Sequence, residues 1–237
     1  MKNISTNCPD SENRYHYFIS QLSHEIRNPL TLIYSSLQLI EADTPSVADT
    51  DLWNQVKDDL RTVIHMLKDV SSLNNTDHLK LTPVVIGDFL SGIKTSFSAL
   101  MHEKSIHFTV FCDPALQNRS ISADRIKLQE AITNLLLNAA ETTLSEHPGI
   151  TCSAVAENGF LAFHVKDNGP GIPEEYLDTL FDPFVTHRQN GTGLGLSIVK
   201  KVATLHGGSI SVTTCTKEPK TGTDFCLRLP LQNITTT

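Results

Sequence analysis

The side chain with the clearest potential for chemistry is His24, which lies in a long helical pattern and is followed directly by Glu25. Apolar residues such as Leu22 and Ile26 recur every three or four positions, as expected for a helix with one buried stripe. His24 is two residues from each of them, so at about 100° per residue its ring is predicted to face solvent. Glu25 can accept a proton or hold one ring tautomer, and Pro29 is expected to bend the helix one turn later. A reactive imidazole and an ordinary solvated histidine both fit this pattern.

A second group of polar side chains follows one face of a helix expected at residues 124–143. Asn134 and Asn138 are four residues apart, so their amides stack on the same face, in a polar stripe with Glu130 and Glu141. An amide oxygen suits Mg²⁺, which keeps most of its coordination for phosphate and water. The pattern predicts either a magnesium ligand or a pair of surface amides.

Asp167 ends a strand expected at residues 160–166 and shares one face with apolar residues of that strand. A carboxylate on the buried side of a sheet needs a hydrogen-bond donor, and the exocyclic amine of adenine is one. Gly169 and Gly171 allow a sharp turn and a close approach of the backbone to a base. The same residues also fit a simple turn at the end of a strand.

Glycines also open a helix expected at residues 194–206. The exposed N–H groups and the dipole of a helix N-terminus form an anion site suited to a triphosphate. No Gly-Lys-Ser/Thr follows, so this is not a P-loop, and no strand precedes it as in a dinucleotide fingerprint. Residues 174–190, just before it, are predicted to form a short lid. The candidate phosphate loop consists of Gly191, Thr192, Gly193, Leu194 and Gly195.

Two long helices must position His24. The first is expected at residues 13–42 after a disordered lead-in, and the second, amphipathic over residues 52–70, ends before Asn74. A turn signal at residues 43–46 makes the pair an antiparallel hairpin. One hairpin cannot cover its own apolar stripe, whereas two hairpins can, as a dimeric four-helix bundle. A plain coiled-coil dimerisation segment is the alternative.

The remainder of the chain alternates helices with paired strands and predicts an α/β sandwich, with helices on one face of a mixed sheet. Asn158-Gly159 is a strong hairpin signal between the strands expected at 150–156 and 160–166. Ser122 or Asp124 can cap the helix expected at 124–143. Further expected elements are an extended piece at 82–86, helices at 88–104, 124–143 and 194–206, and strands at 106–111, 150–156, 160–166, 209–214 and 223–230.

The composition limits the partners. Nineteen basic and 26 acidic residues give a formal charge of -7 without a basic stripe, which argues against nucleic acid or an anionic membrane. The five cysteines form no Cys-x-x-Cys pair and no metal spacing, so we expect reduced thiols that fill structure. No apolar run approaches the roughly 18 residues of a membrane span, and the polar N-terminus lacks a signal peptide. We therefore expect no direct membrane insertion and a cytoplasmic location.

Five short motifs, in this order, resemble those of the two-component sensor histidine kinases, and the nitrogen-regulation-like subgroup in particular. The resemblance covers residues 13–231. Residues 23–30 resemble the H box, 134–141 the N box, 167–173 the first glycine box, 181–184 the F box and 191–200 the second glycine box.

This resemblance implies a transmitter region in which the helical hairpin forms a dimeric four-helix bundle and the α/β sandwich is an ATPase domain of Bergerat type. It implies ATP and Mg²⁺ as cofactors, a homodimer, and the receiver domain of a response regulator as partner. The implied segments are a disordered lead-in (1–12), a dimerisation and histidine phosphotransfer hairpin (13–77), a catalytic ATP-binding domain (82–231) and a tail (232–237).

The family's roles transfer to named residues. His24 would accept a phosphoryl group from ATP and pass it to an aspartate of the regulator, with Glu25 as general base. Asn28 would place a water for dephosphorylation of the regulator. The lid departs from the subgroup, which has Thr-Thr-Lys there, so Arg188 is the expected phosphate cation; we also expect no sensory domain before the H box. The implied nucleotide-binding residues are Asn134, Asn138 (also the metal ligand), Asp167, Gly169, Gly171, Arg188, Gly191, Thr192, Gly193, Leu194 and Gly195.

Two functions of other classes fit part of the pattern. A non-catalytic dimeric scaffold would bind a regulator without phosphate chemistry, but the intact motifs disfavour it, and a nucleotide titration separates the two. A related ATPase that drives conformational change would lack an H-box hairpin, so the helix around His24 disfavours that class.

Overall fold

The computed structural model describes residues 9–74, 78–143, 147–187, 191–217, 220–230 and 234–236. The chain divides into two compact units, one formed by Met1–Asp77 with His187–Leu194 and the other by His78–Thr186 with Gly195–Thr237. Among the described residues, no helix combines the length and the apolarity needed to cross a bilayer.

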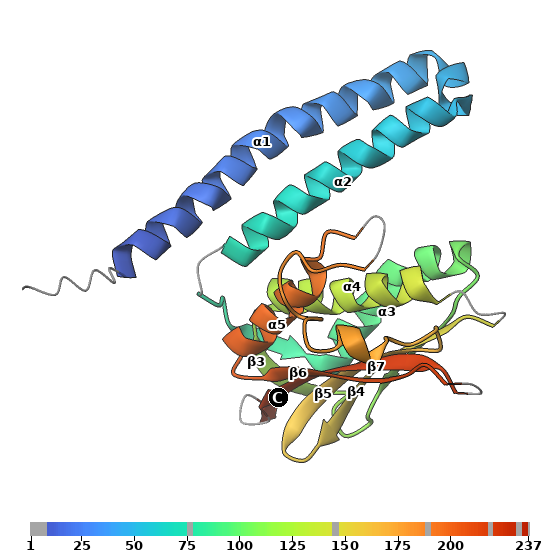
Figure 1. Ribbon diagram of the computed structural model, residues 1–237. Helices are drawn as coiled ribbons and strands as arrows, with labels where there is room; N and C mark the ends of the chain where they lie inside the picture. Colours follow the sequence, from blue (N-terminus) through green and yellow to red (C-terminus); the bar gives the residue numbers. More distant parts are fainter. Residues whose placement is uncertain are drawn as a thin grey trace, which may run out of the picture. The chain divides into compact units, whose positions relative to one another are not determined.

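The helices of the first unit form an antiparallel hairpin (Figure 1). Helix α1 (Pro9–Asp43) and helix α2 (Asp51–Asn74) are joined by a short 3-10 helix, η1 (Pro45–Asp49). The expected disordered lead-in is wrong for residues 9–12, which are helical; residues 1–8 lie outside the described part. Proline is tolerated at the first position of a helix because its missing N–H has no intrahelical partner there, so α1 can begin at Pro9.

The hairpin leaves much of its apolar stripe uncovered. Leu22 and Ile26 are 44% and 40% exposed, and other large apolar side chains of both helices are also more than a third exposed. Within one chain, α1 and α2 therefore do not bury the surface that makes them amphipathic. The exposed set also includes Leu32, Ile33, Leu39 and Ile40 of α1, and Leu52, Val56, Val63 and Met66 of α2.

The second unit is built on a five-stranded sheet in the order β2-β4-β5-β7-β6, with helices α3, α4 and α5 on one of its faces (Figure 1). Strands β2 and β4 are parallel and the other pairs are antiparallel. The sheet consists of β2 (His107–Cys112), β4 (Gly149–Glu157), β5 (Phe160–Asp167), β7 (Gly222–Pro230) and β6 (Ser209–Cys215); the helices are α3 (Ile86–Glu103), α4 (Arg125–Thr142) and α5 (Gly195–Leu205).

The core of this unit lies between the sheet and the helices. Leu161, Phe163 and Val165 alternate along β5 and are fully buried, and the ring of Phe163 meets that of Phe89 on α3 edge to face, with centroids 5.9 Å apart. The predicted fold class, a helical hairpin followed by an α/β sandwich with a mixed sheet, is confirmed.

A second, smaller sheet was not expected from the sequence. It has the order β1-β3-β8, formed by β1 (Thr82–Val85), β3 (Arg119–Ala123) and β8 (Ile234–Thr236). Within the segment predicted as a tail, residues 234–236 are all β-branched and add a short antiparallel strand to β3.

Candidate functional site

Helix α4 begins at a strong N-terminal cap. Asp124 precedes it, and its carboxylate Oδ1 accepts the N–H groups of Ile126 and Lys127, both at 3.1 Å. Oδ2 accepts the N–H of Lys80 at 3.0 Å. Burial alone would raise the pKa of Asp124, but these three N–H groups, that of Lys80 first, together lower it. An ionised carboxylate therefore fixes the start of α4, and of the two caps considered, Ser122 and Asp124, the second is confirmed.

Replacing Asp124 by alanine is expected to lower the free energy of unfolding by about 1 kcal/mol or more, because the helix loses its cap. The folded-state pKa is lowered, so this contribution is complete above the pKa of the unfolded carboxyl and is lost as pH falls through the folded value. Urea unfolding at a series of pH values from 7 downward should show that the difference in free energy of unfolding between wild type and variant becomes smaller as the pH falls. Asp88→Asn, exposed on α3, is the control; a gap that stays constant with pH would contradict the role of the carboxylate.

Asn134 and Asn138 lie on α4 with half-buried side chains. Asn134 faces the first residue of α5: a Cβ placed on Gly195 would lie 3.3 Å from Asn134 Oδ1. Glycine thus allows the start of α5 to approach the amide closely. The structure brings together these parts of two motifs separated by about 60 residues in the sequence.

Asp167 is the last residue of β5, and its side chain lies on the same face as Leu161, Phe163 and Val165. It is only 5% exposed, and Oδ1 accepts the N–H of Gly169 at 2.8 Å. This bond holds the carboxylate in place at the end of an apolar row, because its donor is a backbone N–H two residues further along the chain.

The turn after Asp167 depends on two glycines. A Cβ on Gly169 would lie 3.0 Å from Asp167 Oδ1 and 3.1 Å from the carbonyl oxygen of Thr142. Gly171 has a φ of +78°, and a Cβ there would lie 2.3 Å from the carbonyl oxygen of Cys215. A side chain is excluded at Gly171 and would be tightly crowded at Gly169, so the backbone itself forms this edge of the site.

The candidate phosphate loop is divided between the two units. Gly191, Thr192, Gly193 and Leu194 belong to the first, and Gly195 opens α5 in the second. In the first unit, the Thr192 hydroxyl donates to Asp69 Oδ2 of α2 at 3.2 Å and accepts the N–H of Leu194 at 3.2 Å. Arg188, expected to meet the phosphates, lies outside the described residues.

The H-box residues lie on α1. His24 is part of the helix, but its side chain lies outside the described part, so its predicted orientation stays a prediction. Glu25 and Asn28 are exposed. Pro29 lies inside the helix, as expected from the sequence.

Arg27 was missed by the sequence interpretation. Its Nη2 donates to the carbonyl oxygen of Leu67 at 2.9 Å and to the hydroxyl of Ser71 at 2.8 Å, so it ties the H-box segment to α2. The signal was its position directly after the stripe residue Ile26, on the side of α1 that faces α2, but its partners are 40 and 44 residues away.

Two family models match the chain, one after the other. Residues 16–78 match the His Kinase A (phospho-acceptor) domain. Residues 123–233 match the family described as histidine kinase-, DNA gyrase B-, and HSP90-like ATPase.

Sensor and hybrid histidine kinases resemble this chain in sequence. The Sensory histidine kinase/phosphatase NtrB of Rhizobium leguminosarum bv. phaseoli is 33% identical over 81% of this chain and 53% of its own length. Hybrid signal transduction histidine kinase D of Dictyostelium discoideum is 32% identical over 90% of this chain and 14% of its own length. The chain thus spans about half or less of these relatives.

Solved structures of histidine kinases are similar to this chain. Full-length ShkA in complex with AMPPNP matches 93% of this chain and 46% of its own, with a TM-score of 0.74 and 27% identity. The catalytic domain of histidine kinase ThkA, in a nucleotide-free form, matches 64% of this chain and 96% of its own, with a TM-score of 0.56 and 28% identity. Because both family models match this chain and its relatives are histidine kinases, the chain belongs to the two-component sensor histidine kinases, of which it carries the transmitter region.

Proposed function

We propose that the chain is an ATP-dependent protein histidine kinase that phosphorylates itself on His24 and passes the phosphoryl group to an aspartate of a response regulator. The single observation that carries this is the phospho-acceptor family match over residues 16–78, followed by the ATPase family match over residues 123–233. We assign residues 13–77 to dimerisation and phosphotransfer, and residues 82–231 to catalysis.

The proposed adenine contact is Asp167. Its carboxylate is buried at the end of an apolar strand face, which suits it to accept a hydrogen bond from the exocyclic amine of a purine. Gly169 and Gly171 let the backbone pack closely beside it, because a Cβ at either position would lie against backbone oxygens. Thr192, Gly193 and Leu194 would offer N–H groups to the phosphates, with Gly191, Gly195 and Arg188.

Asn138 is the proposed magnesium ligand, with Asn134 beside it on the same face of α4. A half-buried neutral amide fits this ion, because Mg²⁺ takes oxygen ligands and keeps several waters and phosphates. When bound, Mg²⁺ would neutralise charge on the transferring phosphate.

Three residues of the H box, His24, Glu25 and Asn28, have separate roles in the proposed transfer of protons and of the phosphoryl group. Glu25 would accept the proton from one ring nitrogen of His24, which leaves the lone pair of the other free to attack the γ-phosphorus as the bond to ADP breaks. The phosphoryl group would then pass to the aspartate of the regulator while Glu25 returns the proton to the ring, which re-forms neutral His24. Asn28 would hold a water in line for dephosphorylation of the regulator; the NtrB relatives are named as phosphatases as well as kinases.

The experiment is an incubation of the purified chain with γ-labelled ATP and Mg²⁺. We expect incorporated label that is lost in acid and stable in base, as for a phosphorus–nitrogen bond. A chain that binds ATP but incorporates no label would contradict the proposal and favour the non-catalytic scaffold. Label that is only acid-stable would contradict a histidine as the acceptor.

The proposed functional form is a homodimer that covers the open stripe of α1 and α2. The stripe offers ten large apolar side chains that are more than a third exposed in the single chain, from Leu22 to Met66. Ile33→Glu is expected to convert the dimer to a monomer, because it places a charge in the covered surface.

Sedimentation over a range of protein concentrations measures this effect. The matched control is Ser35→Glu, which puts the same charge at an exposed position about 200° further around the helix. A wild-type chain that stays monomeric, or an Ile33→Glu variant that dimerises like the control, would contradict the assignment.

A further inference from the structure

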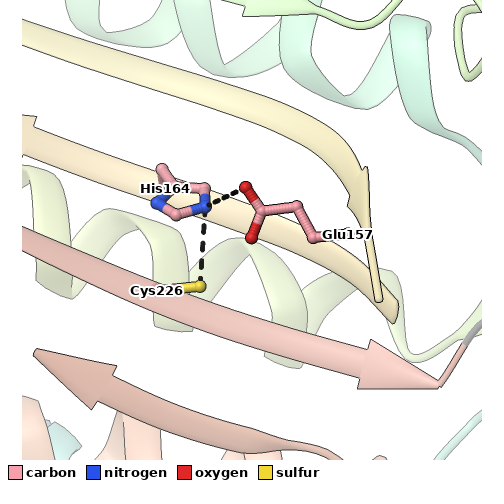
Figure 2. A group of neighbouring side chains, drawn as sticks. All are labelled: Glu157, His164 and Cys226. Carbon is pink, nitrogen blue, oxygen red and sulfur yellow. Dashed lines mark hydrogen bonds and ion pairs between the residues drawn. The ribbon is translucent and has the colours of Figure 1, made fainter. Parts of the chain in front are cut away.

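Four polar side chains meet on the face of the five-stranded sheet opposite to α3, α4 and α5. On β5, Phe163 and Val165 are buried toward the helices, so His164 between them points to the other face. Cys226 on β7 is its register partner, and Asp224 lies two residues away on the same face. Glu157 reaches the ring from the end of β4. Figure 2 shows the side chains of Glu157, His164 and Cys226 converging on one point.

The two nitrogens of His164 face different groups. Nδ1 lies 3.0 Å and 3.2 Å from the two carboxylate oxygens of Asp224. A carboxylate only accepts, so Nδ1 carries a hydrogen and donates it. Nε2 lies 3.4 Å from Glu157 Oε1 and 3.6 Å from Cys226 Sγ. In the neutral ring, Nε2 carries a lone pair that points toward the carboxylate of Glu157 and the sulfur of Cys226. A cation between these atoms would stabilise the arrangement.

The two distances from Nε2 are close to those of a tetrahedral metal site. Zinc bonds of about 2.0 Å to nitrogen or oxygen and about 2.3 Å to sulfur place nitrogen about 3.3 Å from oxygen and about 3.5 Å from sulfur, against the 3.4 Å and 3.6 Å found here. The ligand atoms of Glu157, His164 and Cys226 all lie within 4.8 Å of one another. The imidazole is also oriented as in metal sites, where the second ring nitrogen commonly donates to a carboxylate, here that of Asp224.

Charge and access also suit a divalent cation. One carboxylate and one thiolate balance two positive charges, and a mixed nitrogen, sulfur and oxygen set selects zinc over magnesium or calcium. Cys226 is 5% exposed, whereas the side chains of His164 and Glu157 are 20% and 39% exposed. The cluster thus has a dry side at the sulfur and an open side through which a metal and a water can enter.

We propose that Glu157, His164 and Cys226 bind Zn²⁺, with Asp224 as the group that orients His164. Binding would release the thiol proton of Cys226 and would tie the β4–β5 hairpin to β7. Asp167 points to the other face of β5, so the metal would stabilise the catalytic domain without entering the nucleotide site.

Cobalt titration of the metal-free full chain tests this proposal. We expect one Co²⁺ per chain to give thiolate-to-cobalt charge-transfer absorption, which Zn²⁺ removes by displacement. Cys226→Ser should lose that absorption, and Cys215→Ser, which changes an exposed thiol, should keep it. The thiol of Cys152 is no competitor, since it is fully buried and pairs with Val165 on the face of the sheet that the helices cover.

Two further variants keep the test decisive. Glu157→Gln removes a ligand at the end of the hairpin without touching the core, so it reports on binding even if Cys226→Ser fails to fold. Asp224→Asn should keep one metal per chain but weaken affinity by about 10- to 100-fold, as expected for an orienting group. Wild type without the charge-transfer band, or a band that Cys226→Ser retains, would overturn the proposal and leave a protonated His164 bridging two carboxylates. ATP binding, which should be unchanged in all these variants, checks that each is folded.

Discussion

Replacing His24 by glutamine is expected to abolish phosphate incorporation from labelled ATP while ATP binding stays unchanged. Glutamine is similar in length and can remain in α1, but its amide nitrogen has no available lone pair, so no phosphorus–nitrogen bond can form. The proposed acceptor lies in the helical unit, and the proposed nucleotide-binding residues Asn138 and Asp167 lie in the other unit. Loss of transfer should therefore separate cleanly from loss of binding, measured by calorimetry on the same preparation.

The control for this substitution is His102→Gln, which changes an exposed histidine at the end of α3. It should incorporate label like the wild type. Incorporation that persists in His24→Gln would refute the acceptor assignment. Simultaneous loss of ATP binding would instead mean that the substitution had damaged the fold of the chain.

Asp167→Asn is expected to weaken ATP binding by about 10- to 100-fold. A hydrogen bond to a charged group contributes about 1.5–3 kcal/mol, and each 1.4 kcal/mol is a factor of ten in Kd. The substitution is nearly isosteric, and the asparagine Oδ1 can still accept the N–H of Gly169 that Asp167 now holds at 2.8 Å. The turn is thus retained, while an acceptor facing the adenine amine becomes a donor.

A second expectation for Asp167→Asn concerns the choice between ATP and GTP. Guanine has a carbonyl oxygen where adenine has its amine, so Asp167→Asn should lose less GTP affinity than ATP affinity. Titrations of both nucleotides against wild type and variant measure the ratio, and Asp88→Asn controls for the lost charge. Equal loss for both nucleotides would show that Asp167 acts through the fold, and unchanged ATP affinity would remove it from the site.

Local sequence signals predicted most of the fold because they act within a few residues. Asn158 and Gly159 have φ of 48° and 84°, the left-handed pair that the hairpin signal requires. Asp124 caps α4 with the two N–H groups that follow it. The apolar periodicity within α1 and within α2 likewise predicted the two helices of the hairpin, because each helix is one continuous segment of the sequence.

Long-range pairing is what the sequence pattern did not contain. Strand β3 is five residues long and is stabilised by β1 and β8, which lie about 40 residues before it and more than 100 after it. Arg27 and the metal cluster were missed for the same reason. His164 and Cys226 are 62 residues apart, with none of the spacing that marks a metal motif, and only the pairing of β5 with β7 brings them together.

In the candidate site, too, the local geometry could be predicted from the sequence and the long-range contacts could not. Asp167, Gly169 and Gly171 are neighbours in sequence, and their local geometry follows from the strand and turn they form. The close approach of Gly195 to Asn134 requires α5 to pack on α4, which no local pattern specifies. The roles of Glu25, Asn28 and Arg188 rest on the family resemblance.

Mapping the phosphorylated residue tests most directly whether His24 receives the γ-phosphate. The chain would be incubated with ATP and Mg²⁺, digested at neutral or basic pH and analysed by mass spectrometry for the modified peptide. A phosphoryl group on His24, and on none of the other nine histidines, is the predicted result. A phosphoryl group on a different residue, or none on a chain that binds ATP, would contradict the assignment of this chain as a kinase that phosphorylates His24.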